Sequence, residues 1–268
     1  MKGRLDIVLP EMGLAASRQK AKELILEGHA EVNGKICLKP SYIVNDDDVI
    51  KITGETLKYV GRGGLKLEKI ISLCDIDING KVCMDIGAST GGFTDCMLQN
   101  GAQTVYAVDV GSGQLAQKLC SDQRVVNMEK TDIRTVKPSD LPALPEFISV
   151  DVSFISLKLI LSHVYELLAE NGTAAVLIKP QFEAGRENVG KNGIVKSRNV
   201  HASVVADILS FTAETGFALT GICHSPITGS KGNIEYLMCL KKGGESQTAD
   251  VKKLVDDAFK NLKSGGKS

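Results

Sequence analysis

The sequence predicts an α/β protein in which a mostly parallel sheet follows a small N-terminal α+β domain. Two observations lead to this prediction. From residue 64 onward, strand-like and helix-like stretches alternate, whereas the first 58 residues contain a helix, a hairpin and a closing strand. A chain of 268 residues has room for both parts. The predicted boundaries are 1–58 for the first domain, 59–63 for a glycine-containing linker and 64–268 for the second domain.

Composition excludes several classes of protein. Lys and Arg number 32, Asp and Glu number 32, and the formal net charge is zero. Overall charge therefore cannot hold nucleic acid, and such a partner needs local basic patches. The seven cysteines form no C-x-x-C pair and no metal-ligand spacing, which indicates reduced thiols, no metal and a cytoplasmic protein. Because apolar runs are short and no signal segment is visible, we expect no membrane association.

The first domain is predicted from local patterns. Residues 17–26 begin with Ser17 as an N-cap and repeat apolar side chains at helical spacing. Asn33 and Gly34 lie between two strand-like runs, which indicates a hairpin, and residues 44–52 form a turn and a closing strand. A charged surface on a small domain would explain this pattern. The stretch SRQKAKELILEGHAEVNGK, however, resembles the RNA-binding module of ribosomal-protein S4 type. That resemblance implies RNA contacts by Arg4, Arg18, Lys20, Lys22 and Lys39.

The second domain is predicted to contain seven strands. Five of them alternate with helical stretches, and they are expected at 82–87, 104–111, 125–129, 147–153 and 174–180. One helix is expected over 155–172 with Gly172 as its C-cap, and another over 199–215. Two further strands at 217–224 and 234–240 precede a packed terminal helix over 248–262.

A glycine-rich stretch, DIGASTGGFTD at 85–95, ends the first of these strands and opens a helix. Its glycines allow a tight turn and a close approach of the backbone to a ligand. Acidic residues follow the next two strands, and carboxylates in these places suit a nucleoside better than a pyrophosphate. The spacing also differs from the dinucleotide fingerprint. The predicted cofactor-binding residues are Asp85, Gly87, Ala88, Ser89, Thr90, Gly91, Gly92, Phe93, Asp109, Asp132 and Ile133.

This order of motifs resembles the class I S-adenosylmethionine-dependent methyltransferases, whose fold is Rossmann-like and whose cofactor is S-adenosyl-L-methionine. The fourth strand ends in Asp151-Val-Ser-Phe154, which differs from the Asp/Asn-Pro-Pro-aromatic motif of enzymes that methylate base amines. The Pro-Cys pair of pyrimidine-carbon methyltransferases is also missing. The chain is instead similar to FtsJ-like ribose methyltransferases with a Lys-Asp-Lys-Glu set. The resemblance implies Lys66, Asp151, Lys179 and Glu235 as catalytic residues.

The chemistry of ribose methylation explains such a set. A ribose 2′-hydroxyl must lose its proton as it attacks the methyl carbon. A solvated lysine has a pKa of about 10.4, but burial and a second ammonium lower that value. Our hypothesis is that Lys179 is the base, that Lys66 positions the hydroxyl and that two carboxylates fix the lysines. Excess carboxylate opposes the shift, and each residue also has an ordinary alternative as a solvated lysine, a helix cap or a surface ion pair.

Other residues are candidates for RNA contact. Phe154 is either a core residue or a platform on which an extruded base stacks. Residues 182–199 are polar and glycine-rich, so they form either a plain surface loop or a lid that substrate orders. The remaining predicted RNA-binding residues are Arg62, Arg134, Phe154 and Arg186.

Taken together, the S4-type module and the motifs GASTGGFTD, VDVSF, IKPQFE and GNIEYL are similar to the TlyA family. Members are ribosomal-RNA cytidine 2′-O-methyltransferases, often catalogued as haemolysins. The resemblance implies ribosomal RNA within ribosomal subunits as partner, S-adenosylmethionine as cofactor and no metal. Two alternatives remain, a non-enzymatic RNA-binding assembly factor and a secreted haemolysin, although no signal segment or membrane span supports the second.

Overall fold

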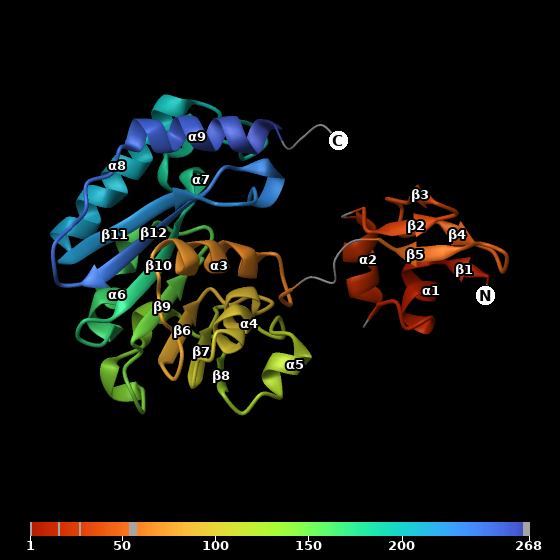
Figure 1. Ribbon diagram of the computed structural model, residues 1–268, viewed down its shortest axis with the longest axis horizontal. Coiled ribbons are helices and arrows are strands. Elements are labelled where there is room, and N and C mark those ends of the chain that lie inside the picture. The colour runs from red at the N-terminus through yellow and green to blue at the C-terminus, as the bar shows by residue number, and fades with distance from the viewer. Residues whose placement is uncertain (1, 16, 27, 54–57, 265–268) are drawn as a thin grey trace. The chain divides into compact units, whose positions relative to one another are not determined.

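The computed structural model describes residues 2–15, 17–26, 28–53 and 58–264. The chain divides into two compact units, Met1–Lys58 and Tyr59–Ser268 (Figure 1). Each unit has a hydrophobic core of its own, and each is described separately. None of the helices in the described ranges is long and apolar enough to cross a membrane.

The first unit packs two helices against short strands. The helices are α1 (Leu5–Glu11) and α2 (Arg18–Leu26). The strands are β1 (Gly3–Arg4), β2 (Ala30–Val32), β3 (Lys35–Ile36), β4 (Ile43–Val44) and β5 (Ile50–Ile52). In the β2–β3 hairpin, Asn33 and Gly34 have φ of 54° and 75°, as the two central residues of its turn require. The sequence analysis predicted α2, the hairpin and β5, but it missed α1.

The second unit is a doubly wound sheet, which confirms the predicted fold class. Its described strands run in the order β11-β12-β10-β9-β6-β7-β8. Strand β12 is antiparallel to both of its neighbours, and the remaining pairs are parallel. The strands are β6 (Val82–Ile86), β7 (Thr104–Val108), β8 (Val125–Met128), β9 (Phe147–Val150), β10 (Thr173–Ile178), β11 (Phe217–His224) and β12 (Tyr236–Lys242).

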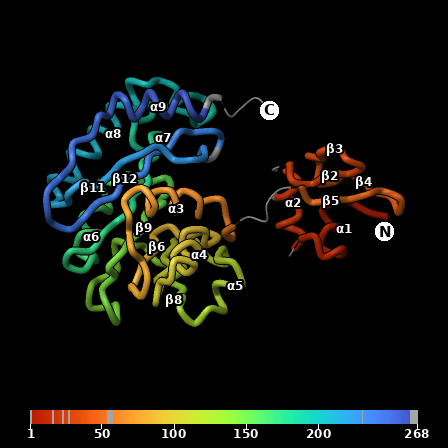
Figure 2. The backbone as a smooth tube through the Cα atoms, in the orientation of Figure 1, coloured from red at the N-terminus to blue at the C-terminus, as the bar shows by residue number. Residues whose placement is uncertain are grey.

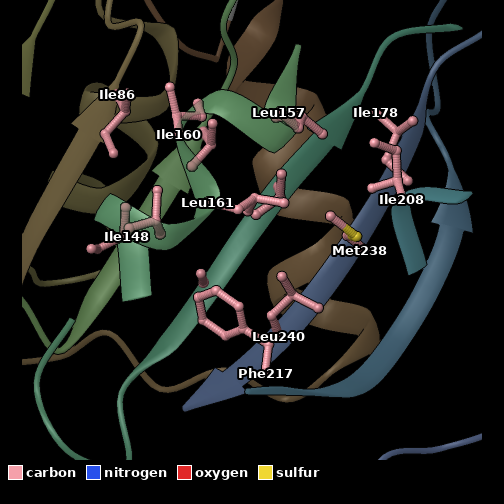
Figure 3. Close-up of a cluster of buried hydrophobic side chains, with 14 of the residues drawn as sticks. Ile86, Ile148, Leu157, Ile160, Leu161, Ile178, Ile208, Phe217, Met238 and Leu240 are labelled. Atoms are coloured by element: carbon pink, nitrogen blue, oxygen red, sulfur yellow. The ribbon is translucent and has the colours of Figure 1, made fainter. Parts of the chain in front are cut away.

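Helices cover both faces of this sheet, because alternate strand residues are apolar on opposite sides. One core joins the sheet to α6, α8 and α9, and Figure 3 shows Leu161, Ile208 and Met238 from it. The other core joins the sheet to α3 and α4. The tube in Figure 2 follows the chain as it crosses between these layers. The helices are α3 (Gly63–Leu73), α4 (Gly92–Gln99), α5 (Gln117–Cys120), α6 (Leu161–Leu167), α7 (Pro180–Glu183), α8 (Arg198–Glu214) and α9 (Val251–Ser264).

Two sequence-based expectations are corrected. The helix predicted over 155–172 is a short 3-10 turn, Leu157–Leu159, followed by α6, which ends at Leu167. Gly172 is therefore no C-cap and instead precedes β10. Residues 59–63, expected to be a linker, belong to the second unit. Tyr59 is buried there, and α3 already begins at Gly63.

Candidate active site

The four predicted catalytic residues come together at one edge of the sheet. Lys66 lies on α3, and Asp151 and Lys179 directly follow β9 and β10. Glu235 directly precedes β12, whose first residue pairs with the last residue of β10. Because β12 runs antiparallel, its beginning reaches the edge where the parallel strands end. Four distant stretches of sequence therefore meet in one place, and we call these residues the quartet.

Ion pairs connect the members of the quartet. The Lys66 Nζ lies 2.7 Å from Glu235 Oε2 and 3.6 Å from Asp151 Oδ2. The Lys179 Nζ lies 2.5 Å from Asp151 Oδ1 and donates to the Ser153 hydroxyl at 3.0 Å. Asp151 thus contacts the amino groups of both lysines. The lysine side chains are only 9% and 10% exposed, so little water screens these pairs.

Electrostatics assign Lys66 a charged state. Burial by itself lowers the pKa of its amine, but the charges and hydrogen bonds of Asp151 and Glu235 outweigh burial and raise the pKa. Lys66 is therefore an ammonium at neutral pH. The expectation that burial and a second ammonium lower the lysine pKa is wrong for Lys66, because two carboxylates surround it. A permanent ammonium can orient an oxygen but cannot accept a proton.

Gly229, which was not predicted to be functional, lies against the Glu235 side chain of the quartet. A Cβ at Gly229 would lie 1.9 Å from Glu235 Oε1, so any side chain there displaces the carboxylate. Its position in a polar turn just before the last strand was the only available signal.

The glycine-rich turn after β6 forms a cradle beside the quartet. Gly87 has φ of 87°, and a Cβ there would lie 2.6 Å from the Asp151 carbonyl oxygen. The Asp109 carboxylate, after β7, accepts hydrogen bonds from the backbone amides of Ser89 at 2.8 Å and Gly111 at 2.7 Å. The turn is therefore fixed on one side by close backbone packing and on the other by a carboxylate.

Asp85 differs from its predicted role as a cofactor ligand. Its side chain is fully buried, and its two oxygens accept hydrogen bonds from Ser149 and Thr94. Burial raises its pKa to about 6, although the bonds from Thr94 and Ser149 oppose the shift. Asp85 therefore fixes the start of α4 through Thr94. Contrary to the prediction, it is not among the residues that line the two cavities described next.

Two cavities open at this edge and share Gly87, Ser89 and Asp151. The first has a volume of about 490 Å³, and Asp109, Asp132 and Ile133 line it. The second has about 270 Å³, includes Lys66, and is lined by the predicted residues Ala88, Thr90, Gly92 and Phe93 as well as Arg62. Gly91, with φ of 92°, caps α4 and lines neither cavity. The predicted cofactor residues other than Asp85 and Gly91 thus line these two adjoining cavities.

The predicted RNA-binding residues of the second unit have varied surroundings. Arg134 forms an ion pair with Asp132 at 2.5 Å, and this pair lowers the pKa of the carboxyl to about 2. Phe154 is 91% exposed, which rules out the core alternative. Arg62 and Arg186 are exposed.

In the first unit, two of the predicted basic residues share one buried carboxylate. Arg4 and Arg18 pair with Asp6 at 2.9 and 3.1 Å, and the hydrogen bond from Arg4 contributes most to lowering the Asp6 pKa. Lys22 and Lys39 are exposed and Lys20 is half-buried. These five side chains therefore remain at the surface of the unit.

Asp95 is a second residue whose role the sequence analysis missed. Its carboxylate accepts a hydrogen bond from the Val60 amide at 2.8 Å and pairs with Lys118 at 2.9 Å. It thereby attaches the segment before α3 to α4. Only its place at the end of the glycine-rich stretch pointed to it.

Comparisons with known proteins agree with this geometry. Residues 59–242 match the model of the FtsJ-like methyltransferases, and residues 3–50 match that of the S4 domain. YqxC of Bacillus subtilis is 48% identical over 98% of this chain and 96% of its own length. The 16S/23S rRNA (cytidine-2′-O)-methyltransferase TlyA of Mycobacterium tuberculosis is 36% identical over 90% of each chain. A solved structure described as a hemolysin of Streptococcus thermophilus is 44% identical, covers 98% of each chain and has a TM-score of 0.80.

These matches extend over both units and include the strands and helices that carry the quartet. The chain belongs to the FtsJ-like methyltransferase family and carries an N-terminal S4 domain.

Proposed function

We propose that this protein transfers a methyl group from S-adenosylmethionine to the ribose 2′-hydroxyl of cytidine in ribosomal RNA. The observation that carries the proposal is the quartet itself. Two lysines whose side chains are almost entirely buried, and which pair with Asp151 and Glu235, are unusual in a protein interior unless they act on a ligand. Relatives with the same two-domain organisation are named for this reaction.

The cradle fits the cofactor. Gly87 packs against the Asp151 backbone, where a side chain would collide, and this contact keeps the turn in one shape at the rim of both cavities. The Asp109 carboxylate lines the first cavity and suits a ribose. Asp132 and Ile133, farther along the same cavity, suit an adenine. When bound, S-adenosylmethionine supplies an electrophilic methyl group.

The chain's own residues then act on the ribose hydroxyl. Lys66, charged because of its two carboxylates, donates a hydrogen bond that orients the oxygen. The Lys179 amine must be neutral for this step, and its Nζ then accepts the hydroxyl proton as the oxygen attacks the methyl carbon. Asp151 holds both amines, and the Ser153 hydroxyl fixes the orientation of the second one. No metal is needed for this displacement.

RNA contacts are assigned to both units. We infer that the basic surface of the S4 domain binds ribosomal RNA in ribosomal subunits, as the relatives' names imply, and that the protein works in the cytoplasm. Phe154 supports this inference, because a fully exposed aromatic ring at the rim of the cofactor cavity suits stacking on an extruded base.

The test is methyl transfer from tritiated S-adenosylmethionine to unmodified ribosomal subunits, followed by mapping of alkali-resistant linkages. A 2′-O-methyl group blocks cleavage at its own phosphodiester. At saturating cofactor, Lys179→Ala is expected to lose nearly all turnover, whereas Lys158→Ala, which removes a half-buried lysine paired with Asp207, retains it. Near-normal turnover by Lys179→Ala would remove that residue from the mechanism. Subunit binding without any transfer by the wild-type protein would favour an assembly factor.

A further inference from the structure

A third cavity, of about 450 Å³, adjoins the first cavity, and none of the predicted cofactor-binding residues lines it. Phe154, Gln181, Phe182 and Arg186 contribute to its lining. Phe154 belongs both to this cavity and to the larger one that contains Asp151. The site for the methyl acceptor and this cavity are therefore adjacent.

The wall of the cavity is held in a fixed shape. Phe154 has φ of 66°, a strained value for a residue with a side chain, and its ring lies 5.0 Å from that of Phe182. Glu183 fixes the two segments together, because it accepts hydrogen bonds from the Ser156 hydroxyl at 2.6 Å and the Leu157 amide at 2.8 Å. A strained, exposed aromatic ring that neighbouring contacts hold in place is typical of a preformed binding surface.

One polar group in this wall lacks a partner. The Gln181 Oε1 is buried and accepts no hydrogen bond, and the only other such side-chain atom among the described residues, Asp151 Oδ1, has the Lys179 Nζ beside it. Leaving a buried acceptor unpaired destabilises the free protein, so such a group calls for an explanation. Gln181 as a whole is half-buried, and it lines the cavity.

We propose that this cavity receives the base of the target nucleotide and that Gln181 selects a cytosine there. The inference rests on the proposed function and extends it to the choice of base. The base stacks on Phe154, and the Gln181 amide turns to accept a hydrogen bond from the exocyclic N4 amino group and to donate one to N3. Arg186, exposed at the rim, is available to a neighbouring phosphate.

This arrangement makes Gln181 a specificity-determining residue. Lys179 and Gln181 are separated by a single proline, so a base held by the glutamine stays close to the amine that takes the ribose proton. Uracil has a carbonyl where cytosine has the amino group and an N–H where cytosine has an unprotonated N3. Both contacts are therefore lost with uracil as long as the Gln181 amide keeps the orientation that pairs with cytosine. A bidentate contact of this kind separates the right base from the wrong one by about tenfold or more.

The experiment uses two kinds of ribosomal subunit, one with the mapped target cytidine and one with uridine in its place. We expect the wild-type protein to have a kcat/KM about tenfold or more higher for the cytidine subunits. Gln181→Leu keeps the bulk of the side chain but lacks the amide, and its ratio should fall to about one. Gln181→Glu retains an acceptor for the amino group and should keep the preference for cytidine. The matched control is Gln103→Leu, an exposed glutamine that directly precedes β7 at the opposite edge of the sheet.

The outcomes separate this inference from the proposed function. An unchanged cytidine-to-uridine ratio in Gln181→Leu, or no preference in the wild-type protein, overturns the role of Gln181 while methylation itself stands. If Gln181→Leu does not fold, the Gln181→Glu ratio decides, and loss of the preference there overturns the role. Transfer to neither subunit by the wild-type protein overturns the proposed function and this inference with it.

Discussion

Replacing Glu235 should destabilise the second unit and abolish methyl transfer. Replacing its partner Lys66 as well should restore most of the stability. The Lys66–Glu235 pair is 2.7 Å long, and its side chains are 9% and 2% exposed. A Glu235→Leu variant leaves the Lys66 ammonium buried with only Asp151, 3.6 Å away. Removing one partner of a buried ion pair lowers the free energy of unfolding by about 3–5 kcal/mol. Because the Asp151 carboxylate remains near Lys66, we expect a loss of about 3 kcal/mol here. In urea this corresponds to a midpoint lower by about 1 M.

The double variant Lys66→Met, Glu235→Leu tests the reasoning. Apolar side chains of similar size need no counter-charge, so its stability should return to within about 1 kcal/mol of the wild-type value. Equilibrium urea unfolding of the wild type, Lys66→Met, Glu235→Leu and the double variant measures the coupling free energy between the two residues. Methyl transfer to ribosomal subunits should be lost in all three variants. A double variant less stable than both single ones, or single variants with an unchanged midpoint, would refute the account of a buried, mutually compensating pair.

Three further predictions concern the cradle. Because burial raises the folded-state pKa of Asp85 to about 6, above its usual value near 4, the folded protein binds more protons than the unfolded chain in that interval. The free energy of unfolding should therefore fall by about 2 kcal/mol as pH rises from 4 to 6, and the urea midpoints of Asp85→Asn should change less across this interval. Gly87→Ala should weaken cofactor binding, as measured by calorimetry, and should lower the Tm more than Gly80→Ala. Both glycines have positive φ, but only a Cβ at Gly87 would collide with backbone atoms, those of Asp151. Asp109→Asn should lower cofactor affinity about tenfold, also by calorimetry, and unchanged affinity would contradict its assignment.

The sequence predicted the sheet well because its strands are strongly patterned and end in recognisable turns. The resemblance to FtsJ-like methyltransferases pointed to the four residues of the quartet, and only Asp151 and Lys179 could be placed at the edge of the sheet from the ends of parallel strands. It failed where tertiary contacts override a local signal. Gly172 looked like a helix end, yet the chain leaves α6 at Leu167 and packs Leu168 into the core instead.

Charge states and burial were beyond the reach of sequence patterns. Asp85 looked like a ligand because it ends a strand, but Thr94 and Ser149 occupy its oxygens. The raised pKa of Lys66 depends on where two carboxylates lie, which no spacing reveals. The roles of Asp95 and Gly229 likewise depend on contacts between segments far apart in the chain.

The antiparallel insertion of β12 has a consequence for biosynthesis. Lys66 and Glu235 are 169 residues apart in the chain, and their contact requires the last strand, β12, to insert between β10 and β11. A growing polypeptide can form the S4 domain and the cradle long before that event. Methyl transfer should therefore begin only after release or near the end of translation, so that a ribosome still making this protein faces an inert nascent chain.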